Sequence, residues 1–306
     1  MNRVNLLTVI LKDHSSYIEE RLKKEITAFE KEGIVIKKRE EIQGKNIIVT
    51  YQLLESSLTT YSKEDFKNIF KHYMANAFSD IIVYDMESKL IHKILTDHYY
   101  YFTPQEKQSI LKHVDGVLDS EEIRYHDGIT YKISRKAKIL HQIMDFLKEN
   151  QTIHMDGFVR FRLKTYLYEL EEGIDKAVEE FLMEKEYDEF IRLLRYFVDI
   201  QEAKIDTANV LISEDGKYVL YDHVNRMINS EYLDDLATEM ADKDISYDDL
   251  LISSLITLAP KKIVIHFAGK VKNKEIIETI KNVFSNRVYI CNGCQLCTLV
   301  QRAKKE

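Results

Sequence analysis

Long stretches without helix-breaking residues constrain this sequence more than any other feature. Residues 158–201 hold one glycine, Gly173, and no proline, and the 306-residue chain has only 2 prolines and 9 glycines. Apolar residues in this stretch recur at steps of three and four, with charged residues between them. The pattern predicts a pair of core-forming helices in a helix-rich protein. The last expected core positions are Phe190, Leu193, Leu194 and Phe197.

The first part of the chain combines strand patterns with a helical one. Residues 6–12 are a β-branched apolar run, which predicts a strand. A helical pattern follows over 17–33 and ends at a glycine. Residues 34–54 predict two further strands joined near Gly44. The order of elements indicates a small β-α-β-β unit.

The last part of the chain returns to strand patterns. Residues 209–222 alternate around an Asp-Gly pair, which is typical of a hairpin, and residues 231–243 predict a helix. Residues 262–267 and 287–291 predict two strands separated by a helix over 273–285. A strand, a helix of about three turns and a second strand are typical of a parallel pair.

The middle of the chain is mainly helical. Residues 62–118 and 137–150 have helical periodicity, whereas residues 122–134 alternate around Asp-Gly and favour a hairpin, with a helical bend as the alternative. We therefore predict an α+β fold that is predominantly α-helical. Its expected parts are a small α+β unit (1–58), a helical domain (59–204) and an α/β unit that ends in cysteines (205–306).

Bulk properties limit the classes of function. The net charge is −7, which argues against a general nucleic-acid binder, because phosphate contacts need a basic face. The apolar stretch near the start is too short for a signal peptide and has no small-residue cleavage site. The longest apolar-rich run, 250–260, falls short of the roughly 20 residues that cross a bilayer. We expect a cytosolic protein without a membrane span.

All three cysteines lie in CNGCQLC, residues 291–297, which we call the cysteine knuckle. Thiolates two residues apart in a tight turn can reach one metal ion, and Gly293 permits such a turn. The spacing also begins the ferredoxin pattern, but the fourth cysteine and the proline are missing. Zinc or an iron–sulfur cluster is therefore the expected ligand of Cys291, Cys294 and Cys297.

A fourth ligand can be inferred from the predicted strands. If strands 262–267 and 287–291 are parallel neighbours, His266 lies near Cys291 at the shared edge. His223, His14 or a second chain could also supply the ligand. Two readings without metal remain, namely a reversible redox pair and three inert thiols packed as small hydrophobic groups.

Two alternative functions rest on other residues. His126-Asp127 and His154 with Asp156 could belong to a metal-dependent phosphohydrolase, with His98, His113 and Asp145 as further ligands, although Asp-Gly is typical of turns. Arg160, Arg162 and Lys164, interleaved with aromatic residues and joined by Arg135, Lys136 and Lys138, could bind nucleic acid. Pairing of these cations with Glu179, Glu184 or Glu186 is the simpler expectation.

Four stretches resemble a known family, the YtxC-like sporulation proteins of endospore-forming bacteria. They are GFVRFRLKTYLYEL (157–170), AVEEFLMEKEYDEFIRLLRYFVDIQ (177–201), DDLLISSLITLAPKKIVIHF (248–267) and RVYICNGCQLC (287–297). The resemblance implies a role in sporulating bacteria but no reaction, cofactor or catalytic residue. We expect a sporulation-associated, non-enzymatic binding or scaffold protein with a protein partner and a metal- or redox-sensitive cysteine knuckle.

Overall fold

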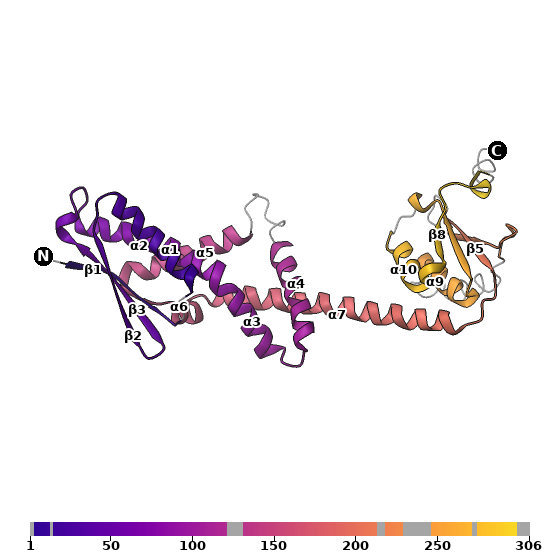
Figure 1. The fold of residues 1–306 in the computed structure, drawn as a ribbon, viewed down its shortest axis with the longest axis horizontal. Coiled ribbons are helices and arrows are strands. Elements are labelled where there is room, and N and C mark those ends of the chain that lie inside the picture. Colours follow the sequence, from indigo (N-terminus) through magenta and orange to yellow (C-terminus); the bar gives the residue numbers. More distant parts are fainter. Residues whose placement is uncertain are drawn as a thin grey trace. The chain divides into compact units, whose positions relative to one another are not determined.

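A computed structural model describes residues 3–12, 15–120, 131–212, 218–228, 246–270 and 274–298. The chain forms two compact units, Met1–Leu182 and Met183–Glu306, which are considered separately below. Each unit contains one four-stranded sheet together with helices (Figure 1). This arrangement confirms the predicted helix-rich α+β fold.

The sheet of the first unit has the strand order β2-β3-β1-β4. Its strands are β1 (Arg3–Leu11), β2 (Ile36–Gln43), β3 (Asn46–Leu54) and β4 (Thr152–His154). β3 pairs antiparallel with both β1 and β2, and the β2–β3 turn places Gly44 at φ 61°, which favours glycine. β4 pairs in parallel with β1. The predicted β-α-β-β order is confirmed, and β4 is an addition to it.

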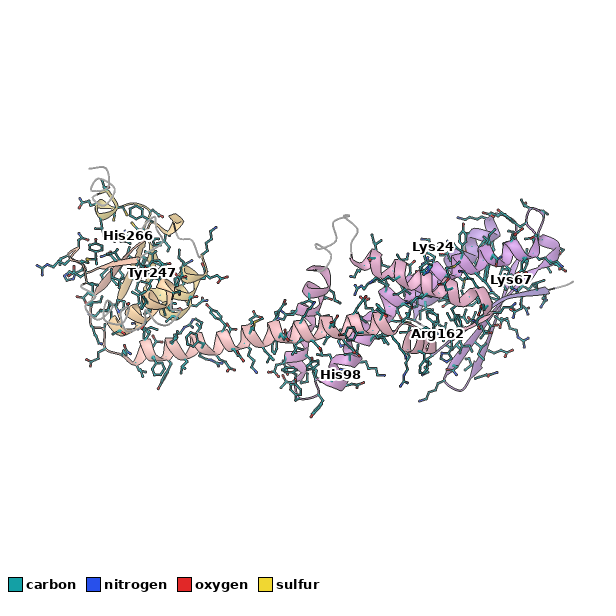
Figure 2. All side chains as sticks on the ribbon, turned by 180° about the vertical axis from the view of Figure 1, so that it is seen from behind. Lys24, Lys67, His98, Arg162, Tyr247 and His266 are labelled. Carbon is teal, nitrogen blue, oxygen red and sulfur yellow. The ribbon has the colours of Figure 1, made fainter. Side chains whose placement is uncertain are left out.

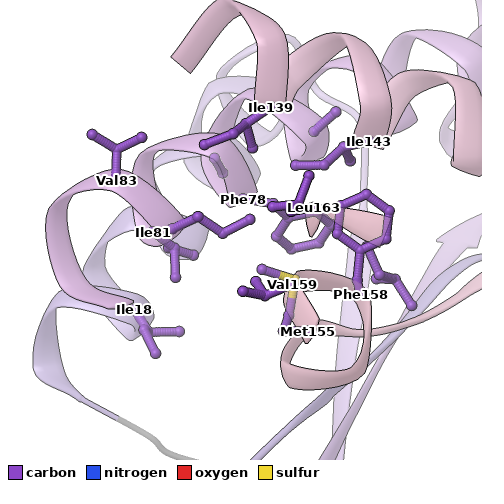
Figure 3. Close-up of a cluster of buried hydrophobic side chains, with 14 of the residues drawn as sticks. Ile18, Phe78, Ile81, Val83, Ile139, Ile143, Met155, Phe158, Val159 and Leu163 are labelled. Atoms are coloured by element: carbon purple, nitrogen blue, oxygen red, sulfur yellow. The ribbon is translucent and has the colours of Figure 1, made fainter. Parts of the chain in front are cut away.

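Helices cover this sheet and make up the rest of the first unit. They are α1 (Ser16–Lys31), α2 (Lys63–Ile81), the π-helical turn η2 (Ile82–Met86), α3 (Glu87–His98), α4 (Pro104–Ser120), α5 (Tyr131–Glu149), α6 (Met155–Arg162) and the start of α7 (Lys164–Ile200). A short 3-10 turn, η1 (Glu55–Ser57), follows β3. Side chains from α1, α2, α5 and α6 gather in one apolar cluster (Figure 3).

One buried ion pair lies among these helices. Arg135 Nη2 on α5 is 3.2 Å from Glu87 Oε1 on α3, and the Tyr166 hydroxyl donates a hydrogen bond of 2.8 Å to Glu87 Oε2. Only 1% of Arg135 is exposed. Burial raises the pKa of Glu87, while Arg135 and the hydrogen bond from Tyr166 act to lower it. The carboxylate is therefore held in the core mainly by these two partners.

Three expectations about the helices were wrong. Residues 131–134 belong to α5 and not to a hairpin, because helical spacing places Arg135, Ile139 and Ile143 on one buried face; residues 121–130 lie outside the described part. Residues 164–200 form one helix, which passes through Gly173 where a Cβ would meet Leu118 Cδ2 at 2.7 Å. The side chains of Phe190, Leu193 and Phe197, expected in the core, are exposed.

The sheet of the second unit has the strand order β6-β5-β7-β8. Its strands are β5 (Thr207–Ile212), β6 (Tyr218–Tyr221), β7 (Lys262–His266) and β8 (Val288–Ile290). β5 and β6 are antiparallel, whereas β7 is parallel to both β5 and β8. The predicted hairpin strands and the parallel βαβ pair are confirmed.

Two helices and the end of α7 accompany this sheet. α9 (Tyr247–Leu258) begins with a capping box between Ser246 and Asp249, and α10 (Glu275–Phe284) joins β7 to β8. Two 3-10 turns, η4 (Ala268–Lys270) and η5 (Ser285–Arg287), flank α10. The helix predicted over 231–243 lies outside the described residues.

The three expected parts of the chain stay a prediction. Residues on both sides of position 58 contribute to the sheet and core of the first unit, so the two compact units are a coarser division than the expected one. Among the described residues, no helix combines the length and apolar character that crossing a membrane would need.

Candidate metal centre

Two parallel strands set the positions of the first two candidate ligands. His266 is the last residue of β7, and Cys291 directly follows β8 (His266 is labelled in Figure 2). The Cys291 amide donates a hydrogen bond of 2.8 Å to the Ile265 carbonyl, which continues the pairing of the two strands by one residue. Because parallel strands end at the same edge of a sheet, this bond holds Cys291 beside His266.

The cysteine knuckle then folds back on itself. Gly293 adopts φ 128°, a conformation that residues with a side chain rarely adopt, and its amide donates to Cys291 Sγ at 3.3 Å. Residues 295–298 form a helical turn in which the Thr298 amide donates to the Cys294 carbonyl at 3.1 Å. This turn returns Cys297 towards the sheet.

Four potential ligand atoms converge at this point. His266 Nδ1 lies 3.3 Å from Cys297 Sγ and 3.6 Å from Cys294 Sγ. Cys297 Sγ lies 3.9 Å from Cys291 Sγ and 3.8 Å from Cys294 Sγ. All four atoms are within 4.8 Å of one another. The predicted proximity of His266 to the three cysteines is therefore present in the structure.

A residue that the sequence did not reveal orients the histidine. His266 Nε2 is 3.1 Å from Asn209 Oδ1, and the Asn209 side-chain amide donates a 2.9 Å hydrogen bond to the Asp222 carbonyl. This second bond turns Oδ1 towards the imidazole, so Nε2 carries the proton and Nδ1 keeps its lone pair for a metal. A polar residue inside the apolar strand 207–212 was the signal available.

Comparison with known proteins places the chain in a family. The model of the YtxC-like family matches residues 72–289, more than two-thirds of the chain. The chain belongs to the YtxC-like family. The matched residues of this YtxC-like chain include Asn209 and His266 and end before Cys291.

One curated relative of this YtxC-like protein comes from Bacillus subtilis (strain 168). It carries the name "Uncharacterized protein YtxC" and is 29% identical over 200 residues, which are 63% of this chain and 68% of the relative. No solved structure matches the chain. The earlier resemblance to the family is thus confirmed, whereas neither comparison assigns an activity.

Burial and hydrogen bonds shift the pKa of His266, Cys294 and Cys297 in this YtxC-like chain. Burial lowers the pKa of His266, which keeps the imidazole neutral, the form that binds metals. Burial also raises the pKa of Cys297 to about 11. For Cys294, burial acts to raise the pKa, but hydrogen bonds, first from the Cys297 amide, bring it below its usual value. A bound cation would favour the thiolate form of all three cysteines.

The other predicted metal ligands do not join this group. His223 is exposed in the turn after β6, and His14 lies outside the described residues. Within the part of the chain that the structure describes, His266 and the three cysteines are the one group of three or more potential ligands close enough to hold one ion.

The described residues that were considered for a phosphohydrolase have different local settings in the first unit. His154 caps α6, where its Nδ1 accepts a 3.1 Å hydrogen bond from the Gly157 amide, as expected for a helix start. Asp156 and His98 line a cavity of about 430 Å³ in the first unit. His113 lies 3.8 Å from Glu180, and Asp145 pairs with Lys148. His126 and Asp127 lie outside the described residues.

The basic residues are distributed over three helices. Arg160 and Arg162 end α6, with their guanidinium groups over the rings of Phe161 and Phe146, and Lys164 begins α7. Arg135, Lys136 and Lys138 on α5 form ion pairs with Glu87, Asp80 and Glu169. Their partners are thus acids other than the expected Glu179, Glu184 and Glu186.

Proposed function

We propose that this chain is a metal-binding protein that works by binding a partner and not by catalysis, and that His266, Cys291, Cys294 and Cys297 hold one zinc ion. The observation that carries the proposal is the spacing of the four ligand atoms. With bonds of about 2.3 Å to sulfur and about 2.0 Å to nitrogen, a tetrahedral zinc site separates two sulfurs by about 3.8 Å and nitrogen from sulfur by about 3.5 Å. The corresponding distances here include 3.8 and 3.9 Å between sulfurs and 3.3 and 3.6 Å from nitrogen to sulfur.

The same spacing favours a single ion over an iron–sulfur cluster. In a four-iron cluster each cysteine binds a different iron atom, and in a two-iron cluster the four ligands are divided between two iron atoms. In either case some ligand atoms stand further apart than the ligands of one ion. Three thiolates and one imidazole also match the ligand set of structural zinc sites. An iron–sulfur cluster would require the knuckle to open.

A site with four protein ligands indicates a structural role for the ion. Catalytic zinc sites keep one position for water or substrate, and here protein atoms would occupy all four positions. The ion would tie the end of β7 to the cysteine knuckle that follows β8. Because such a site does not exist in the unfolded chain, zinc binding would stabilise the second unit.

Elemental analysis tests this proposal. The full chain, purified anaerobically without a metal-affinity step, is expected to contain one zinc per molecule and no iron. His266→Ala and Cys294→Ser are expected to lose the metal, whereas His223→Ala, an exposed histidine in the same unit, is expected to retain it. Substoichiometric zinc and iron in the unaltered protein would contradict the proposal.

We also propose that this binding protein acts in sporulation. Support comes from the resemblance to sporulation proteins set out in the sequence analysis, together with the match to the YtxC-like family, and from the exposed apolar residues available to a partner. In the host of this chain, deletion of the gene is expected to lower the yield of heat-resistant spores, and replacing the three cysteines with serine is expected to have the same effect. An unchanged spore yield in the deletion strain would contradict this role.

A further inference from the structure

The last five turns of α7 carry an exposed apolar stripe. We call Met183, Phe190, Leu193, Phe197 and Ile200 the heptad face; their exposed fractions are 62, 55, 52, 44 and 60%. Two rows make up this face, one at positions 183, 190 and 197 and the other at 193 and 200, each with a repeat of seven residues. The rows are three residues apart, which is the pattern of a coiled-coil seam.

An adjoining side of the same helix is fixed within the second unit. Ile191 and Val198 are 6% and 0% exposed and belong to the core of that unit. Arg195 Nε donates a 3.0 Å hydrogen bond to the Asn282 carbonyl, and Arg287 Nη2 lies 3.2 Å from Asp199 Oδ1. These contacts set the rotation of the helix, so its heptad face points away from that core.

The size of the exposed surface is sufficient for an interface. Tyr196 extends the heptad face at its border and is 60% exposed. Together the six side chains present on the order of 500 Å² of apolar surface, a large part of the roughly 800 Å² that each partner contributes to a standard interface. Apolar patches of this size on soluble proteins mark interaction sites.

We propose that a second copy of this chain covers the heptad face, so that two α7 helices pair antiparallel. Antiparallel pairing sets Met183 against Ile200 of the second copy and Phe190 against its Leu193, and symmetry makes each contact twice. The face is therefore complementary to itself. The exposed border of the heptad face carries one acidic and one basic residue, Glu189 and Arg192. Two copies of the chain can place these opposite charges near each other, so the interface does not need a highly charged partner.

One acidic residue in the seam determines the direction of pairing. Glu186 occupies the position seven residues before Leu193, within the row of Leu193 and Ile200. Parallel helices would place the two Glu186 carboxylates face to face, where like charges repel. Antiparallel helices place each Glu186 beside Phe197 of the other copy, which avoids this repulsion but weakens the dimer.

Sedimentation velocity of the full chain tests the proposal over concentrations of about 1 to 100 µM. We expect a dimer, and we expect the double substitution Phe190→Glu with Leu193→Glu to give a monomer with an unchanged circular dichroism spectrum. Ile42→Glu is the matched control, because Ile42 is 78% exposed on β2 of the first unit. A wild-type monomer at every concentration, or a dimer that survives the double substitution, would overturn the proposal.

A substitution that is expected to strengthen the dimer gives a second test, which does not depend on disrupting the interface. Glu186→Leu completes the second row of the heptad face and is expected to lower the dimer dissociation constant by about tenfold or more. An unchanged dissociation constant, or assembly beyond the dimer, would count against an antiparallel pair of α7 helices. Zinc content is expected to be the same in all these variants, so failure here and failure of the metal site are distinguishable.

Discussion

His266 Nδ1 lies 3.3 Å from Cys297 Sγ, although the two residues are 31 positions apart in the chain. The parallel pairing of β7 and β8 brings the histidine to the cysteine knuckle, and the helical turn 295–298 brings Cys297 to the histidine. The candidate site thus depends on the fold of the whole second unit. Binding of a metal and folding of that unit are expected to be coupled.

Removal of zinc is expected to destabilise the second unit. A strong chelator should lower the melting temperature of this unit by more than about 5 °C, because the binding free energy of structural zinc is part of the folding free energy. Differential scanning calorimetry of the full chain measures the change. His223→Ala should show the same sensitivity to the chelator, and an identical transition with and without chelator would contradict the coupling.

Asn209 is expected to affect zinc affinity without binding the ion. Asn209→Ala removes the acceptor that holds the Nε2 proton of His266, so zinc affinity should fall by about 10- to 100-fold. Competition with a chromophoric chelator measures this affinity. Asn282→Ala, at an exposed position of α10, serves as the control. Equal affinities of the Asn209 variant and the wild type would rule out the orienting role.

Gly293 is expected to be required for the turn of the cysteine knuckle. Its φ of 128° is strained for any residue with a side chain, at a cost of about 1–3 kcal/mol, so Gly293→Ala should weaken zinc binding by about tenfold or more. Gly269→Ala is the matched control in the same unit, since Gly269 has no positive φ and its added Cβ meets nothing within 4 Å. The same competition assay compares the two variants, and similar affinities would contradict this requirement.

The buried pair in the first unit gives a prediction about pH. Arg135→Met leaves Glu87 in the core without its cation and is expected to lower the free energy of unfolding by about 3–5 kcal/mol near neutral pH. Because the pKa of Glu87 is raised in the folded protein, the folded state holds the proton more tightly than the unfolded state. The contribution of Glu87 to the free energy of unfolding therefore falls as pH rises above the usual pKa of a glutamate side chain.

Arg135 acts to lower that pKa, so its removal raises the pKa further and widens the pH range of this loss. The loss in the free energy of unfolding of Arg135→Met relative to wild type should be small near pH 4 and grow towards about pH 7. Urea unfolding at several pH values measures this loss. Lys138→Met on the same helix removes an ion pair that is partly exposed and should cost less than about 1 kcal/mol. A deficit that is independent of pH would contradict the role of Glu87.

The sequence was sufficient to predict the elements that build the candidate site. β-branched runs on either side of an amphipathic helix predicted β7, α10 and β8, and the rule that parallel strands end together placed His266 near Cys291. Asn209 could not be assigned, because its role depends on the pairing of β5 with β7 and on the Asp222 carbonyl. A polar residue inside an apolar strand marks this position in the sequence, but its partners are set by tertiary structure.

Helical periodicity alone also led to a wrong expectation about which side chains of α7 are buried. Phe190, Leu193 and Phe197 follow helical spacing as core residues do, yet only the side of α7 that carries Ile191 and Val198 packs inside the second unit. A helix that is apolar on two sides shows the same periodicity of apolar residues in the sequence whether its second side packs against its own chain or against another chain. β4 was missed because three residues are too few to show a period.

X-ray absorption at the zinc edge on the anaerobically purified full chain is the most direct measurement of the central claim. Our account predicts three sulfur ligands at about 2.3 Å and one nitrogen ligand at about 2.0 Å from a single zinc ion. The His266→Ala variant should lose the nitrogen ligand or the ion. A zinc environment made only of oxygen and nitrogen ligands, or a protein without zinc, would contradict the account.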